Sequence, residues 1–207
     1  MIRMRMGFKK HRGMSHPQWQ DFLKKQNLTS LDHSSEDVAY GVKAWLDRLE
    51  CDFNLKSFKP IRQSSKNIEI LTSFSENSAS LLLEYANYFH KQLSLLESDE
   101  PVDLHKKIVI IGVPEIESTF DYLEFYGMQN LNAYRNQLAI HIKSAAYDHI
   151  LIREDQPLDD ILPALAHQLT LSVFFDQKLP QSISEKLTQI YLEKPALGEE
   201  QVLTTSF

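Results

Sequence analysis

Apolar residues recur at intervals of three and four positions in several stretches of the chain, which predicts amphipathic helices. The predicted helices cover residues 35–49, 75–96, 115–126, 159–175 and 182–192. The first begins with Ser35-Glu36-Asp37, whose acids favour a helix N-terminus, and Ser75 caps the second. Gly127 fits the C-terminal cap of the third. The fourth has almost no polar face, so it is expected to be the central, buried helix.

Between the helices, short apolar or alternating stretches predict strands at residues 67–73, 107–112, 137–143 and 149–153. The stretch 107–112 (KIVIIG) is almost wholly apolar and indicates a buried strand, whereas 137–143 (QLAIHIK) alternates and indicates a half-exposed one. Helices and strands in this order predict an α+β fold with a small mixed sheet and flanking helices. We expect one domain over residues 35–195.

The 207-residue chain is 43% hydrophobic, which is enough for a substantial core. It has no apolar run of about 18 residues, so no membrane span is predicted. The single cysteine, Cys51, excludes an intramolecular disulfide and a thiolate-rich zinc site. These features favour a reducing, cytoplasmic location.

Charge is unevenly distributed along the chain. Residues 1–31 hold seven Lys and Arg against one acid, Asp21, although the whole chain has a net charge of −6. The acidic body argues against nucleic-acid binding. Residues 1–34 are expected to form a basic, poorly ordered segment, and residues 196–207 a tail.

The most informative motif lies in the fourth predicted helix, at His167-Gln168-Leu169-Thr170-Leu171. Further on, Leu179-Pro180 is followed by Ser184-Glu185-Lys186-Leu187-Thr188 and Tyr191. Together these segments resemble the gluzincin-type zinc metallopeptidases of the MA clan. The resemblance covers residues 67–193 in layout, with the motif helix central in a zincin-like architecture.

In those peptidases the motif is His-Glu-x-x-His, in which two His bind zinc and the Glu polarises the attacking water. The resemblance places His167 at the first ligand, Gln168 at the general base, Leu171 at the second ligand and Glu185 at the third ligand. Leu171 cannot bind metal, and Gln168 lacks a basic carboxylate. We therefore expect a pseudoenzyme without a cofactor and without catalytic residues, in which these four positions are vestigial.

Two hypotheses follow from this motif. In the first, the protein is a non-catalytic module that binds a protein or peptide partner along the strand 137–143, through Gln137, Ala139, His141 and Lys143. In the second, it is a metal-dependent hydrolase with an unusual zinc site formed by His167, Glu185 and a third ligand. His141, or else His149, would supply that ligand, because both lie on or near the predicted edge strand.

Overall fold

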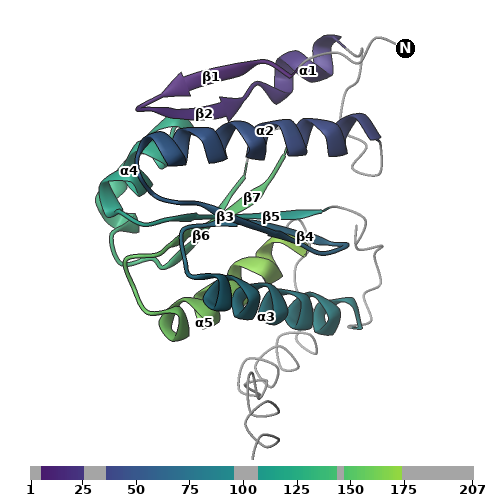
Figure 1. Cartoon of the computed structure of the whole chain (residues 1–207), viewed down its shortest axis with the longest axis vertical. Coiled ribbons are helices and arrows are strands. Elements are labelled where there is room, and N and C mark those ends of the chain that lie inside the picture. Colours follow the sequence, from purple (N-terminus) through teal and green to yellow (C-terminus); the bar gives the residue numbers. More distant parts are fainter. Residues whose placement is uncertain (1–5, 26–35, 96–106, 144–146, 174–207) are drawn as a thin grey trace, which may run out of the picture.

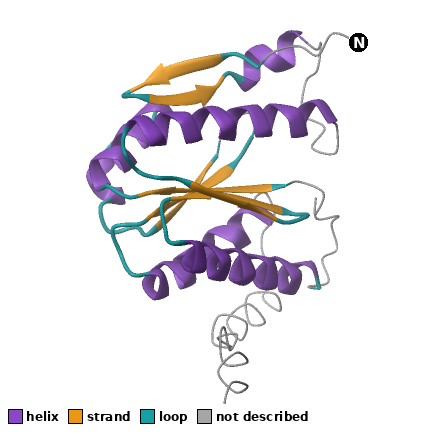
Figure 2. Cartoon of the chain, in the orientation of Figure 1, coloured by secondary structure: helices purple, strands orange, loops and turns teal. Residues whose placement is uncertain are grey.

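The computed structural model describes residues 6–25, 36–95, 107–143 and 147–173. In this part of the chain, a five-stranded sheet lies between two layers of helices, and a two-stranded hairpin stacks outside one layer (Figures 1 and 2). The helices are α1 (Trp19–Lys25), α2 (Glu36–Leu55), α3 (Glu76–Ser94), α4 (Ile116–Phe125) and α5 (Leu158–Val173), with a 3-10 turn at Leu131–Tyr134. The strands are β1 (Phe8–His11), β2 (Met14–Pro17), β3 (Ile61–Ser64), β4 (Ile68–Thr72), β5 (Ile108–Val113), β6 (Ala139–Ile142) and β7 (His149–Arg153). The predicted α+β class is confirmed.

The large sheet has the strand order β3-β4-β5-β7-β6. The three inner strands β4, β5 and β7 are parallel, whereas β3 and β6 run antiparallel to them at the two edges. Every residue of β5 is buried, as expected for an apolar strand at the centre of a parallel sheet. The predicted edge strand is confirmed as β6.

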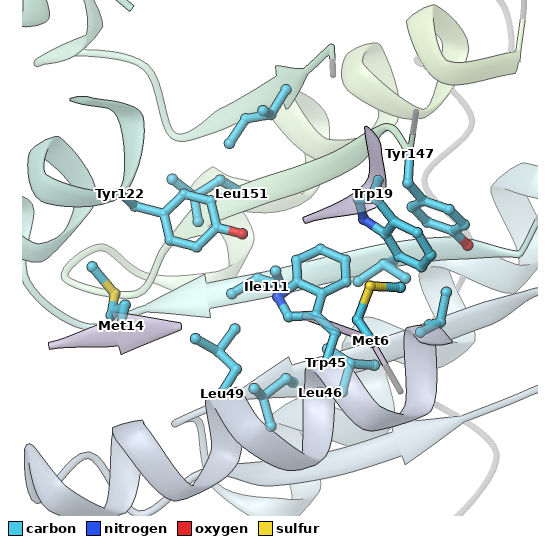
Figure 3. Packing of buried hydrophobic residues seen from close by; sticks show 14 of the residues in the cluster. Met6, Met14, Trp19, Trp45, Leu46, Leu49, Ile111, Tyr122, Tyr147 and Leu151 are labelled. Carbon is cyan, nitrogen blue, oxygen red and sulfur yellow. The ribbon is translucent and has the colours of Figure 1, made fainter. Parts of the chain in front are cut away.

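The sheet separates two hydrophobic clusters. Side chains alternate along a strand, so Val109, Ile111 and Val113 of β5 join the cluster under α2, while Ile108 and Ile110 join the cluster under α3 and α5. Figure 3 shows the first cluster, in which the aromatic rings of Trp19, Trp45 and Tyr147 lie close together. Each face of the sheet therefore has a core of its own.

Local signals explain where two of the helices begin and end. The Ser75 hydroxyl accepts a hydrogen bond from the Ser78 N–H at 3.2 Å, which caps α3 as predicted. After α4 the chain reverses at Gly127, whose φ of +73° lies in the left-handed region that glycine adopts without strain.

Part of the N-terminal segment expected to be poorly ordered has regular structure. Arg12 and Gly13 both have positive φ, and they form the two-residue turn of the hairpin β1–β2. The hairpin and α1 bury Met14 and Trp19 against α2. Its basic residues pair with acids of the body, for example Lys10 with Asp52 at 3.2 Å.

Two sequence-based expectations about the C-terminal half were wrong. The strand expected to be half-exposed, β6, is mostly buried, because helix α5 covers one of its faces and Ile140 and Ile142 join the cluster on the other. The predicted strand 149–153 is confirmed as β7, which lies in the interior of the sheet. Helix α5 is buried on one face only, since His167 and Leu171 are exposed. The fifth predicted helix lies outside the described residues. Among the described helices, none is long and apolar enough to cross a membrane.

Candidate functional site

The motif helix and the edge strand are neighbours. Helix α5 packs against β6 and β7, and it covers the face of the sheet that it shares with α3 (Figure 1). Gln168, at the position of the general base in the resemblance, is half-buried, and its Oε1 accepts a hydrogen bond from the backbone N–H of His141 at 2.9 Å. The structure thus joins two residues that the sequence analysis had selected for separate reasons.

The pairing of β6 with β7 determines which backbone groups of β6 point outward. Arg153 N–H donates to the Leu138 carbonyl at 2.9 Å, in the same antiparallel register as the ladder from Ala139 to Ile142. Hydrogen-bonded pairs alternate in such a ladder. The N–H and C=O groups of Ala139 and His141 therefore point away from β7, toward the edge of the sheet.

The Gln168 side chain meets one of these outward groups. Its amide oxygen lies where the carbonyl of an additional strand would accept from His141 N–H. A sheet edge with unmet donors is prone to pair with other chains, and natural proteins often cover such edges. Gln168 therefore acts as a partial cover on β6.

The side chain of His141 points toward α5 rather than toward solvent. Its neighbour two residues away, Ala139, belongs to the cluster under α3 and α5, whereas Ile140 and Ile142 belong to the opposite cluster. The His141 side chain is only 4% exposed, and its Nε2 lies 3.8 Å from Asp148 Oδ2. The remaining predicted binding residues, Gln137 and Lys143, are exposed just beyond the two ends of β6.

His149 lies on the other face of the sheet from α5. Its buried ring is hydrogen-bonded to the Tyr122 hydroxyl, with 2.9 Å between Nε2 and the oxygen, and it contacts the ring of Trp45. Burial raises the pKa of Tyr122 well above its ordinary value, so this phenol stays neutral. His149 does lie near the edge strand, since it pairs with Ile142 of β6, but its ring is on the face of the sheet opposite α5, so the sheet separates His149 from His167.

The described residues hold only part of the ligand set that the peptidase resemblance implies. Catalytic zinc takes three protein ligands, yet the described residues hold no group of three or more His, Cys, Asp or Glu side chains that could bind a metal ion. Leu171 supplies no donor, and the Gln168 oxygen is engaged by His141 N–H. Glu185 lies outside the described residues.

A second polar centre, which the sequence analysis did not select, lies at the carboxyl ends of the parallel strands. Glu154 follows β7, and its carboxylate reaches across β5 to the turn after β4. Ser73 N–H donates to both carboxylate oxygens at 3.1 and 2.9 Å, and the Thr72 hydroxyl donates to one of them. A Cβ on Gly112 would overlap this carboxylate, so the crossing requires glycine in β5.

Burial raises the pKa of Glu154 to about 7, although the hydrogen bonds from Thr72 and Ser73 lower it. The carboxyl ends of parallel strands are the usual ligand-binding edge of such sheets. Here the protein's own carboxylate occupies this edge. Polar residues at the end of one predicted strand and directly after another were the available signal, but the strand order that brings them together was unknown.

Comparisons with known proteins found no matching family model, no similar curated protein and no similar solved structure.

Proposed function

We propose that this protein is a non-catalytic, metallopeptidase-like module that binds an extended segment of a protein partner along β6. The observation that supports this most directly is the hydrogen bond from His141 N–H to Gln168 Oε1. A side-chain amide there imitates the carbonyl of an incoming strand. Exchange of this amide for a peptide carbonyl would open the edge without breaking the β6–β7 ladder.

The outward groups of β6 favour an extended partner. Ala139 and His141 are two residues apart, so their N–H and C=O groups repeat at the spacing of a β-strand. Main-chain hydrogen bonds of this kind give affinity in strand addition, while neighbouring side chains give selectivity. The exposed Leu171 and His167 of α5 would contact alternate side chains of the bound segment.

The chemistry of the motif positions supports a binding role over hydrolysis. An amide at Gln168 cannot accept a proton from a water molecule at neutral pH, and Leu171 cannot hold a metal. Helix α5, which carries the motif positions, lies beside the antiparallel edge strand β6. The proposal is therefore peptide binding at the β6 edge beside α5, without the catalytic groups of a peptidase.

The alternative is a metal-dependent hydrolase that uses His167, Glu185 and His141. One observation favours it, because the His141 side chain lies on the same face of the sheet as α5. It requires a bound metal, so the zinc content of the protein separates the two functions.

Proline substitutions at outward positions test the strand-addition proposal. Ala139→Pro removes an N–H that points away from β7 and so leaves the β6–β7 ladder intact. The matched control is Ser64→Pro, because Ser64 occupies the corresponding outward position on β3, at the opposite edge of the sheet.

Peptides would be selected from a random displayed library against the wild-type chain, and their affinities measured by calorimetry. We expect Ala139→Pro to lower the affinity for the selected peptides by about tenfold, which is the effect of losing one main-chain hydrogen bond. Ser64→Pro should leave that affinity unchanged. The His141 amide should become slower to exchange with solvent on binding. Equal binding by both variants, or a library that yields no binders, would contradict the proposal.

A further inference from the structure

A small cavity lies between the first half of α2 and the sheet, near the edge formed by β3 and far from the opposite edge formed by β6. Its volume is about 250 Å³, and its apolar wall is formed by Val38, Ala39 and Val42 of α2. Tyr147 closes another side. This site is independent of the proposed peptide-binding edge, because it lies over the β3–β4 half of the sheet.

The floor of the cavity is an ionic cluster built around Glu69 of β4. Glu69 is 6% exposed, and its two oxygens contact the Arg62 Nε and the Lys107 Nζ, each at 2.6 Å. Arg62 also pairs with Asp47 at 2.5 Å. Lys43 adds a further cation, so the residues that line the cavity include three cations, Lys43, Arg62 and Lys107, and one carboxylate, that of Glu69.

The wall formed by Tyr147 is held in place on both sides. Its hydroxyl donates to the Lys107 carbonyl, and its ring stacks on Trp19 with 5.2 Å between centroids and 19° between planes. The cavity is therefore shaped before any ligand enters. Such preformed concave sites, with mostly apolar walls and a few polar groups, are typical of small-molecule binding.

Placing an ionic cluster on a buried face of a sheet costs free energy of desolvation, which apolar residues would not. Apolar residues of similar volume often stabilise a fold as well as a buried ion pair does, because the charges lose their hydration. Here the cluster also borders space that no side chain of the described residues fills. The charge and the space are both explained if a ligand completes the site.

We propose that this cavity binds a small amphipathic carboxylate. Its apolar part would lie against Val38 and Val42, and its carboxylate would accept hydrogen bonds from Lys107 and Lys43. An ammonium group has three N–H donors, so Lys107 can hold Glu69 and a bound carboxylate together. The volume limits the ligand to about the size of a single aromatic acid.

Benzoate, its neutral analogue benzamide and the cation benzylamine are suitable probes, because they share a ring and differ in charge. Binding to the full-length chain would be followed by amide shifts in two-dimensional NMR. We expect benzoate to shift the amides of Val42, Lys107 and Tyr147, and to bind at least about tenfold more tightly than the other two probes. Equal affinity for the three probes, or no shift at these residues, would overturn the proposal.

Two variants and a control locate the binding. Lys107→Met removes one cation and should lower the affinity for benzoate by about tenfold, with little effect on the affinity for benzamide. Ala39→Leu keeps every charge but narrows the mouth of the cavity, so it should weaken both probes even if Lys107→Met does not fold. Lys66→Met removes an exposed lysine outside the cavity and should leave binding unchanged. Benzoate binding that all three variants retain would refute the assignment.

Discussion

Replacing Glu154 with Gln should change the pH dependence of stability in a defined direction. Burial raises the pKa of this carboxyl from 4.5 to about 7 in the folded protein, so the folded state holds its proton more tightly than the unfolded chain. A raised pKa contributes stability that is fully present below pH 4.5 and is lost as the pH rises through 7. Glutamine does not titrate, so the variant lacks this loss.

The size of the effect follows from the two pKa values. A difference of about 2.5 units corresponds to about 3 kcal/mol, most of which is lost between pH 4.5 and pH 8. The free energy of unfolding of Glu154→Gln, minus that of the wild type, should therefore rise by about 3 kcal/mol over this interval. The difference between the variants is the useful quantity, because His16 titrates in an overlapping range with the opposite sign.

Urea unfolding followed by tryptophan fluorescence measures this difference, since Trp19 and Trp45 are both buried. The control is Glu84→Gln, which alters an exposed carboxylate on α3 and should give a curve parallel to the wild type. If the Glu154→Gln curve is also parallel to the wild type, the Glu154 carboxylate is not buried across β5 and the reasoning fails.

Three further outcomes are expected. Protein purified with zinc present and without chelator should contain far less than one zinc per chain by elemental mass spectrometry. About one zinc per chain, lost in His167→Ala, would contradict this expectation and support the hydrolase alternative. Burial lowers the pKa of His16 to about 3, so the folded state loses stability as the pH falls below 6.5. Between pH 7.5 and pH 4.5, the free energy of unfolding of His16→Phe, measured in urea, should fall by about 3 kcal/mol less than that of the wild type. Equal decreases in the two proteins would refute this. Gly112→Ala should destabilise the wild type by about 2 kcal/mol or more, because the new Cβ would overlap the Glu154 carboxylate. In a Glu154→Ala background the same change should cost much less, as a double-mutant cycle would measure. Additive effects of the two substitutions would contradict the predicted overlap.

Helices and buried strands were predictable because the spacing of apolar residues within a single segment indicates its secondary structure and its buried face. The apolar positions of α2, from Val38 to Leu49, recur on one face, and all of those that the pattern selected are buried. The same holds for the continuous apolar run of β5. By contrast, β3 has a single apolar residue, Ile61, and its extended conformation follows from pairing with β4.

The candidate site was partly predictable for the same reason. The alternation at residues 137–143 identified the edge strand, and the motif pattern identified Gln168. Their contact required the fold, because the His141 N–H and the Gln168 side chain are separated by 27 residues.

Long-range packing placed the remaining polar residues. Glu154 meets Ser73 across 81 residues of chain because the parallel strands β4, β5 and β7 end at one edge of the sheet. Similarly, His141 and His149 are close in sequence but lie on opposite faces of the sheet. His149 pairs with Ile142 and shares its face, whereas His141, the residue before Ile142, points to the other face. Periodicity determines which residues share a face of one element, whereas strand order and register determine which faces of different elements meet.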